Sequence, residues 1–539
     1  MAIVLLNQAS TELARSFIRD IANENDIYYF YVARTQVWSD EENVESPVDS
    51  VRYINESRKN ILMVKRIVES DVALVANRFN WESGVVYDQY DDRIGENGFR
   101  SHSGEIELSK SIFYVMTEDF NVYKCLSNNN ETPSTFQPTG QSISPFNTED
   151  GYTWKFMFQV TQADRNKFLT PDYIPVRKMS GTGSPLFDVN GFLDGVEVVE
   201  TGSGYIEPPL VTVLGDGQGA VVYATLDNGQ VSEFVVEEPG DGYTFARIVI
   251  TSASGDPGSG AEGRAILGAK EVGIIQETVE NASVEGTIDR IDLVAGGQDY
   301  VNGDIIVDII GDGEGAEAIA RADDVGKIYE IEVVNPGSGY TFAEITIRNG
   351  TVGVAGADAT ARAIVSPIWG HGGNPPRELF ADKVCISVNL DNETSDYFYN
   401  NDFRQIGIIK NPIIYDYTAE SPELYMDITG TTLHRITVNE EDFDKFNYDD
   451  VVATDSQGRF VVVSKDAATF GIGLLHEIDN IELSSKLTIV NTEYTNLTIN
   501  TLEQPEVDTK HGFITYIDNR LRVVRQEDQV EKIRTILQF

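Results

Sequence analysis

One hydrophobic pattern recurs four times between about Val196 and Val365. Each copy has an alternating apolar run, a Gly-rich turn that ends in Tyr, a second alternating run, and a segment of small residues that begins with Gly-Ala. Alternation with a period of two predicts strands with one buried face. The turn tyrosines lie 38, 57 and 40 residues apart, at Tyr205, Tyr243, Tyr300 and Tyr340. This unequal spacing predicts two duplicated pairs of β modules with shared cores, rather than an even array.

Helical spacing of apolar residues is confined mainly to the first part of the chain. We predict a helix over residues 8–27, on which Leu13, Phe17 and Ile21 share one face. A second helix is predicted over residues 50–68. Both would belong to a mixed α/β region that precedes the repeats.

Short apolar runs outside the repeats predict further strands. Residues 27–32 form a continuous apolar run, which is typical of a strand buried on both faces. The other predicted strands are at 111–116, 122–126 and 150–158, within 384–413, within a β-rich stretch at 415–504, and near the C-terminus at 512–517 and 529–539.

Gly-, Pro- and Ser-rich stretches mark two junctions in the chain, at residues 180–184 and 367–376. We therefore predict a β-rich α+β protein in which a discontinuous mixed α/β core carries two insertions. The core comprises residues 1–184, 368–415 and 508–539. The inserted block of four β repeats comprises residues 185–367, and a second, smaller β-rich insertion comprises residues 416–507.

Composition and charge narrow the classes of function. The 539 residues contain 86 acidic and 41 basic side chains, a formal net charge of -45. Phosphate contacts need Lys and Arg, so nucleic acid is not an expected partner. No apolar run of membrane-spanning length and no basic leader are present in the sequence, so we predict neither a membrane span nor a signal peptide. Cys125 and Cys385 lack a CxxC spacing and are interpreted as two buried, reduced thiols.

The sequence contains no recognisable catalytic or metal-binding pattern. The five histidines have no zinc-type spacing, and the loop Gly370-His371-Gly372-Gly373-Asn374 is interpreted as a glycine-rich turn, because no GxSxG nucleophile accompanies it. Gly215–Gly219 and Gly311–Gly315 are acidic turns that resemble calcium-binding repeats only faintly; tight hairpin turns account better for them. We expect no cofactor, no metal and no enzymatic activity.

The four repeat tyrosines allow two interpretations. A Tyr directly after a Gly turn caps the small core of a module, because glycine lets the ring lie over the backbone. Alternatively, Tyr205, Tyr243, Tyr300 and Tyr340 form an exposed aromatic row that stacks on host glycan.

Several stretches outside the repeats resemble one protein family. They are residues 31–43 (YVARTQVWSDEEN), residues 150–154 (DGYTW), residues 402–412 (DFRQIGIIKNP), and the C-terminal residues 516–520 and 528–533 with the final Phe539. In this order they resemble the baseplate wedge subunit encoded by gene eight of T-even-type contractile-tailed phages. The resemblance covers about half of the chain, and both predicted insertions depart from it. It implies an α/β core, a homodimer, incorporation beside other wedge proteins in the six-fold baseplate, and no catalytic residues.

Within these stretches we select candidate interface residues: Arg34, Trp38, Trp154, Arg404 and Phe539. Trp38 is either an aromatic anchor at a subunit contact or a side chain that covers the end of a strand. Arg404 pairs either with a partner's carboxylate or with one in its own domain.

The leading hypothesis is therefore a late structural protein of the virion. It would be assembled in the host cytoplasm into the tail baseplate, hold neighbouring wedge proteins together and reposition when the contractile tail shortens. The alternative is a virion protein that binds host-surface glycan through the repeats. A glycan-cleaving enzyme with two opposed carboxylates ranks third.

Overall fold

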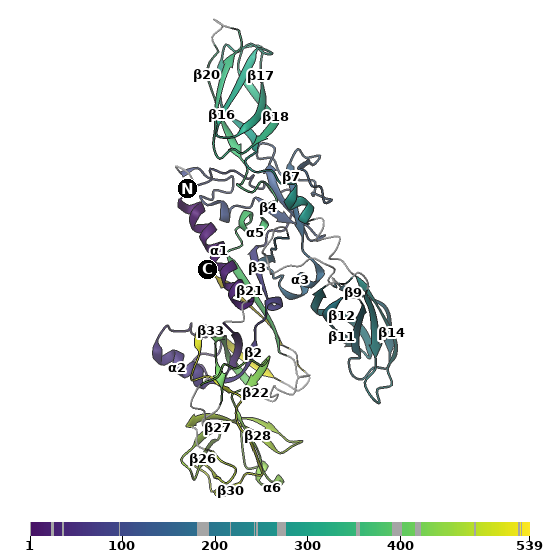
Figure 1. Cartoon of the computed structure of the whole chain (residues 1–539), viewed down its shortest axis with the longest axis vertical. Helices are drawn as coiled ribbons and strands as arrows, with labels where there is room; N and C mark the ends of the chain where they lie inside the picture. Colours follow the sequence, from purple (N-terminus) through teal and green to yellow (C-terminus); the bar gives the residue numbers. More distant parts are fainter. Residues whose placement is uncertain are drawn as a thin grey trace. The chain divides into compact units, whose positions relative to one another are not determined.

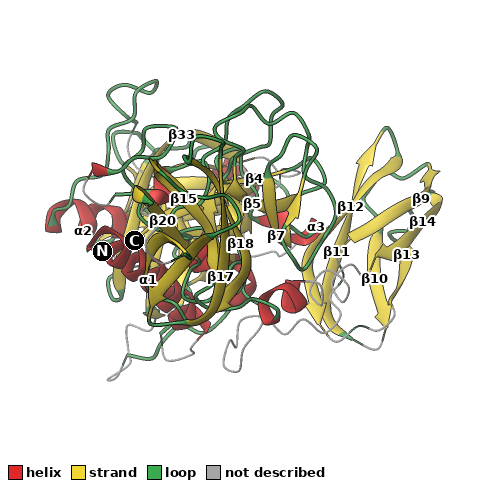
Figure 2. Ribbon diagram, turned by 90° about the horizontal axis from the view of Figure 1, so that it is seen from above, coloured by secondary structure: helices red, strands yellow, loops and turns green. Residues whose placement is uncertain are grey.

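The structure is a computed structural model in which strands dominate (Figure 2). It describes residues 2–22, 26–34, 37–95, 98–179, 193, 195–215, 217–241, 243, 246–266, 276–351, 356–390, 401–415, 422–478, 481–525, 529 and 531–539. Strands make up 48% of the chain and helices 11%, which confirms the predicted β-rich α+β class.

The chain divides into two compact units, each built from more than one stretch of sequence (Figure 1). Unit 1 comprises Met1–Ser16, Ala73–Cys385 and Ile536–Phe539; unit 2 comprises Phe17–Val72 and Ile386–Thr535.

Unit 2 contains a five-stranded antiparallel sheet that joins segments far apart in the sequence. Its order is β24-β2-β1-β22-β33, with β24 at Thr429–Thr431, β2 at Ile61–Arg66, β1 at Tyr28–Ala33, β22 at Asn401–Lys410 and β33 at Phe513–Arg525. Every side chain of β1 is buried, as its continuous apolar run predicts. Tyr31 pairs with Gly407, where a Cβ atom would lie 2.4 Å from the Tyr31 ring. Glycine at this position therefore lets the two strands pair.

The second sheet of unit 2 belongs to the predicted 416–507 stretch. Its order is β30-β29-β26-β27-β28-β25-β31, and it encloses an aliphatic and aromatic core centred on Phe446, Val452, Phe460 and Leu474. The short strands β23 (Ile413–Ile414) and β32 (Val507–Asp508) pair where this stretch begins and ends. The bounds are β25 His434–Thr437, α6 Glu440–Phe443, β26 Val451–Thr454, β27 Arg459–Asp466, β28 Gly471–Ile478, β29 Lys486–Ile489, β30 Leu497–Thr498 and β31 Thr501–Glu503.

Outside the repeats, unit 1 contains the sheet β4-β5-β7-β6, and a further sheet has the order β34-β21-β3-β8, in which β34, β21 and β3 each carry residues of both units. The chain passes between the units inside α1, β3, β21 and β34. The bounds are α1 Ala2–Ala22, β3 Val72–Asn77, β4 Tyr114–Met116, β5 Asn121–Ser127, β6 Phe146–Asn147, β7 Thr153–Gln159, α3 Gln162–Lys167, β8 Tyr173–Pro175, α5 Pro375–Glu378, β21 Lys383–Leu390 and β34 Glu531–Gln538. Short 3-10 turns are described at Leu108–Lys110 in unit 1 and at Glu69–Asp71 in unit 2.

The four repeats form two modules of six strands each, and both lie in unit 1. In each module the third strand of one copy pairs with the first strand of the other, and the two second strands pair with each other. The first module has β9 Gly195–Ser203, β10 Leu210–Gly215, β11 Gln218–Asp227, β12 Gln230–Asp241, β13 Ala246–Thr251 and β14 Ser259–Ile266. The second has β15 Ile288–Gln298, β16 Ile305–Gly311, β17 Glu314–Ala322, β18 Ile328–Ser338, β19 Ala343–Asn349 and β20 Ala357–Val365. Because the copies exchange strands, the module and not the single repeat is the folding unit.

Between the two modules the chain returns to the rest of unit 1. Residues 276–281 are helical, and Val279 is fully buried in the same hydrophobic cluster as Trp154 and Tyr87. Gln276 also donates a hydrogen bond to the carbonyl oxygen of Arg177 at 2.7 Å. The repeats are thus attached as two separate modules, with a core-packed segment between them.

Two helix predictions need correction. The first helix, α1, begins at Ala2 and ends at Ala22, because Ile27 already leads into β1. Leu13 is 58% exposed; the buried face carries Thr11, Ala14, Ile18 and Ile21.

The predicted helix at 50–68 is also wrong in its second half. The helix α2 covers only Val51–Lys59, is capped by the Ser50 hydroxyl, and ends before the strand β2. The apolar run of β2 completes the buried sheet instead of continuing the helix.

Candidate functional site

Three arginines of unit 2 converge on one carboxylate, that of Asp402 in β22. Arg34 Nε and Arg522 Nε donate to its two oxygens at 2.6 and 2.7 Å, and Arg404 Nη1 donates at 2.7 Å. Asp402 and Arg404 are only 4% and 5% exposed. Burial alone would raise the pKa of Asp402, but the hydrogen bonds from Arg34 and Arg522 outweigh it and lower the pKa. The carboxylate therefore stays ionised as the centre of the cluster.

Two of these arginines were candidate interface residues, and both pair within the chain. Arg404 Nε donates to Glu41 Oε1 at 3.1 Å, and Arg34 Nη1 donates to Asp449 Oδ1 at 2.6 Å. Of the two interpretations of Arg404, the structure favours a carboxylate in its own unit. Arg34 joins the five-stranded sheet to the segment just before β26.

Trp38 lies against the strand β33 beside the Asp402 cluster. Its indole Nε1 donates to the carbonyl oxygen of Arg520 at 2.9 Å, and its backbone N–H donates to Glu41 at 3.2 Å. Beside it, Asn519 donates to the carbonyl oxygen of Glu45 at 2.8 Å and accepts from Tyr53 at 2.9 Å. The segment from Trp38 to Glu45 is thus fixed on β22 and β33 by polar contacts.

A cavity of about 850 Å³ in unit 2 adjoins this cluster. Its charged lining is largely paired within the chain: Arg34 with Asp449, Arg52 with Glu56, and Glu477 with Arg459. It is lined by Arg34, Arg52, Tyr53, Glu56, Ser57, Lys59, Asn60, Gln405, Asp449, Val451, Val461, Val463, Leu475, His476 and Glu477. With cations and carboxylates balanced, the cavity shows no preference for an ion of either sign.

The other two interface candidates lie in unit 1. Trp154 is fully buried, stacked on Tyr152 at 5.5 Å between ring centroids and packed edge-on against Tyr87 at 5.8 Å. It is a core residue and offers no surface to a partner. Phe539 is 36% exposed and donates its backbone N–H to the carbonyl oxygen of Asp382 at 3.2 Å.

All four repeat tyrosines are buried, with exposures of 3–5%. Each ring lies against the small-residue segment of the other copy in its module. The hydroxyl groups of Tyr205, Tyr243 and Tyr340 accept hydrogen bonds from the backbone N–H groups of Ala261, Ala220 and Ala316 at 3.2, 3.4 and 3.4 Å. For Tyr300, a Cβ at Gly356 would come within 2.6 Å of the ring. These tyrosines therefore form module cores, and no ring is available for a sugar.

Of the two acidic turns, Gly215–Gly219 has its carboxylate at Asp216, which lies outside the described residues, whereas Asp312 of Gly311–Gly315 is occupied by hydrogen-bond donors of the chain. Asp312 accepts from the N–H and hydroxyl groups of Thr341 at 2.8 and 2.6 Å, and its pKa is lowered by these bonds. In the first module, Asp256 accepts in the same way from the N–H groups of Ile206, Glu207 and Gly258. Among the described residues, no group of three His, Cys, Asp or Glu side chains is arranged to hold a metal ion.

Unit 1 contains a buried ionic cluster that is not among the residues predicted from the sequence. Lys124 Nζ pairs with Glu378 Oε2 at 2.9 Å, and both side chains are fully buried. Glu378 also accepts from the N–H groups of Gly372 and Asn374 and so binds the backbone of the glycine-rich loop. The signal was a lysine in the middle of the apolar strand β5, which needs a counter-ion when buried.

The second repeat module is held on the rest of unit 1 by its first and last strands. Arg290 of β15 donates to the carbonyl oxygens of Tyr90 and Leu126 at 2.7 and 2.9 Å. Arg362 of β20 pairs with both Asp91 and Asp292. His371, just after the module, pairs with Asp289 at its start. These contacts attach the base of the module firmly.

Neither cysteine forms a disulfide, and both are buried. In the part of the chain that the structure describes, no helix is long and apolar enough to cross a membrane. No protein-family model matches the chain, and no curated protein matches its sequence.

Proposed function

We propose that this chain is a structural subunit of the baseplate wedge in a contractile phage tail. The observation that best supports the proposal is the Asp402 cluster. It joins three stretches on which the family resemblance rests, through Arg34 and Trp38 of the first, Asp402 and Arg404 of the third, and Arg520 near the C-terminus. Residues that are 368 and 482 positions apart in the sequence thus form one polar network.

A protein of this kind acts through its surfaces. Large contacts with its own copy and with other wedge proteins would supply the binding energy. On tail contraction the subunit would move as packed bodies between two arrangements. The contacts of Arg290, Arg362 and His371 suit this role, because they would make the second repeat module move with the rest of unit 1.

We do not extend the proposal to host glycan. The aromatic row that suggested it is absent from the surface, because Tyr205, Tyr243, Tyr300 and Tyr340 are buried.

A genetic experiment in the phage that encodes the chain tests the proposal. Without the gene, we expect infected cells to accumulate heads and wedge precursors but few complete tails, as seen by electron microscopy. A plasmid copy should restore infectious particles. Complete tails with normal baseplates in its absence would contradict the proposal.

A further inference from the structure

Each repeat module has an attached end and a free end. In the first module, Leu193 at the entry of the chain donates its backbone N–H to the carbonyl oxygen of Pro239 at 2.8 Å, shortly before the second Tyr turn. In the second module, Tyr340 donates in the same way to Gly286, directly before β15, at 3.0 Å. The turns that follow β9 and β15 therefore lie at the opposite, free ends of the modules.

Three turns meet at each free end. The backbone N–H of the buried tyrosine donates to the carbonyl oxygen of a hairpin turn, Tyr205 to Gly229 at 3.1 Å and Tyr300 to Gly326 at 3.0 Å. A carboxylate in each module joins the third turn to the first through backbone N–H groups. The free ends are called the first tip (residues 204–210, 227–229 and 252–258) and the second tip (residues 299–304, 323–327 and 349–351). Because hydrogen bonds fix the turns, the shape of each tip is set before anything binds.

Both tips expose apolar side chains. Ile206 and Leu210 of the first tip are 76% and 67% exposed, and Val301 and Val325 of the second are 48% and 78% exposed. Ile206 and Val301 each follow the buried tyrosine directly, whereas the residue after the tyrosine at both attached ends is a threonine. A single exposed apolar residue needs no explanation, but apolar residues at corresponding places on two free ends indicate a contact surface.

Carboxylates flank these apolar side chains. The first tip has three carboxylates and no Lys or Arg, and the second has four carboxylates and one cation, Lys327. The side chains of Glu207, Asp299 and Asp324 are exposed and form no hydrogen bond or ion pair with the part of the chain that the structure describes. Each tip therefore combines exposed apolar side chains with unpaired negative charge.

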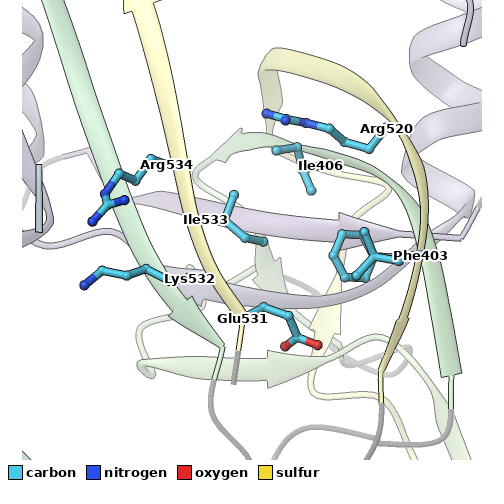
Figure 3. Close-up of a pocket in the computed structure, with 8 residues that line it drawn as sticks. Phe403, Ile406, Arg520, Glu531, Lys532, Ile533 and Arg534 are labelled. Atoms are coloured by element: carbon cyan, nitrogen blue, oxygen red, sulfur yellow. The ribbon is translucent and has the colours of Figure 1, made fainter. Parts of the chain in front are cut away.

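A pocket of about 480 Å³ beside β33 and β34 in unit 2 differs from the tips in this respect (Figure 3). Of the charged residues that line it, Arg520 and Glu531 form ion pairs within the chain at 2.7 and 3.0 Å. Lys532 and Arg534 also have interactions within the chain. The charges around this pocket are thus already engaged, whereas those at the tips are available to a partner.

We propose that the two tips bind basic surfaces of another protein, each with an apolar side chain at its centre. Lys or Arg side chains of the partner would pair with Glu207, Asp299 and Asp324, and its apolar side chains would pack on Ile206 and Val325. Protein interfaces commonly have this anatomy, an apolar centre within a polar rim. The inference deepens the proposed function, on which it rests, by giving the chemistry of one partner.

Charge favours this occupant over the alternatives. A second copy of the chain has a net charge of -45, and nucleic acids and anionic membrane surfaces are negative as well. Each of these would meet like charge at the tips. A basic protein surface is instead attracted, and its cations are paired on contact.

The test uses the purified full chain and a short peptide of Lys and Leu residues that carries one photo-reactive benzoylphenylalanine. After irradiation, mass spectrometry maps the cross-links and measures their yield at each tip. We expect the cross-links to concentrate at the two tips. Val325→Ser and Asp324→Asn should each lower the yield at the second tip about threefold or more, with the first tip of the same molecule as the internal reference.

Matched controls lie in the same module, away from its tip. Val294 on β15 is 71% exposed, and Glu344 on β19 is exposed near the attached end. Val294→Ser and Glu344→Gln should change the yield at the second tip by less than about 1.5-fold. Equal losses in the controls and in the tip variants would contradict the inference.

Three further results would overturn it. The first is a set of cross-links spread over the acidic surface without enrichment at the tips. The second is an equal yield at the tips with a peptide in which Glu replaces Lys. The third is an oligomer of the chain that dissociates in the Ile206→Ser or Val325→Ser variant by analytical ultracentrifugation, because the tips would then belong to a second copy. Since these measurements use purified protein, their outcome is independent of whether the gene is needed for tail assembly.

Discussion

At the scale of single residues, the Asp402 carboxylate is the centre of an ionic cluster with three arginines in unit 2. Asp402→Asn would leave Arg404 buried without its main counter-charge. We therefore expect the free energy of unfolding to fall by about 3–5 kcal/mol. Asp449→Asn is the matched control, since Asp449 binds the same Arg34 at the same distance but its side chain is 71% exposed. It should cost less than about 1 kcal/mol. Hydrogen exchange of β22 by mass spectrometry measures the loss of stability in each variant. Equal losses in the Asp402→Asn and Asp449→Asn variants would contradict the account.

The same residue predicts a pH dependence. Because its pKa is lower in the folded chain, Asp402 contributes stability above the ordinary carboxyl pKa of about 3.9. That contribution is lost as the pH falls further. The difference in stability between wild type and Asp402→Asn should therefore shrink between neutral pH and pH ~3.

Two glycines of one repeat turn give a second test at this scale. Gly337 and Gly339 both have positive φ, at 62° and 76°. A Cβ at Gly337 would lie 2.5 Å from the backbone nitrogen of Ala316, whereas at Gly339 the nearest atom is 3.9 Å away. Gly339→Ala should cost about 1–2 kcal/mol in backbone strain. Gly337→Ala should cost about 1–3 kcal/mol more, because backbone atoms must move. Similar thermal melts for the two variants would show that the close approach does not matter.

The sequence indicates which residues are unusual more readily than it indicates the partners with which they pair. The motif residues Arg34, Trp38 and Arg404 could be selected from the sequence, but their partners are too distant in the chain to infer. Lys124 and Glu378 are 254 residues apart, and nothing in either local pattern indicates the other. Burial of Trp154 depends on packing that local pattern does not specify, whereas the Gly turn before each repeat tyrosine already indicates a position in the module core.

At the scale of elements, the repeat modules make a clear prediction. Deleting one copy, β18–β20, removes the partner strands of β15, β16 and β17. We expect the remaining half module to stay unfolded and aggregate. Deleting the whole module, residues 288–365, should leave a soluble chain with a cooperative melt by circular dichroism. The account would be wrong if the half deletion were as well folded as the full one.

Strands were easier to predict than helix ends. Two patterns specify strands directly. The alternation in the repeats is typical of strands with one buried face, and the continuous apolar run of β1 is typical of a strand buried on both faces. The run Ile61–Val64 suits a buried helix as well as a buried strand, so its local pattern does not distinguish the two. The sheet decides the outcome, since β2 pairs with β1 on one side and β24 on the other. The sequence does not show that the copies exchange strands, because strand pairing within one copy and strand pairing between two copies would bury the same residues.

At the scale of the whole molecule, the charge of -45 limits how the chain assembles. Acidic surfaces repel one another, so the surfaces of its partners should be basic where they meet this chain. Assembly through such contacts should weaken as salt is raised, because exposed charge pairs are screened.

The central claim is that this chain is a wedge subunit, and a cryo-electron microscopy map of the tail of its phage tests it most directly. The account predicts density for unit 1, unit 2 and both repeat modules in the baseplate, repeated around the six-fold axis. Density for the chain in the head or along the tail tube, or its absence from the particle, would contradict the claim.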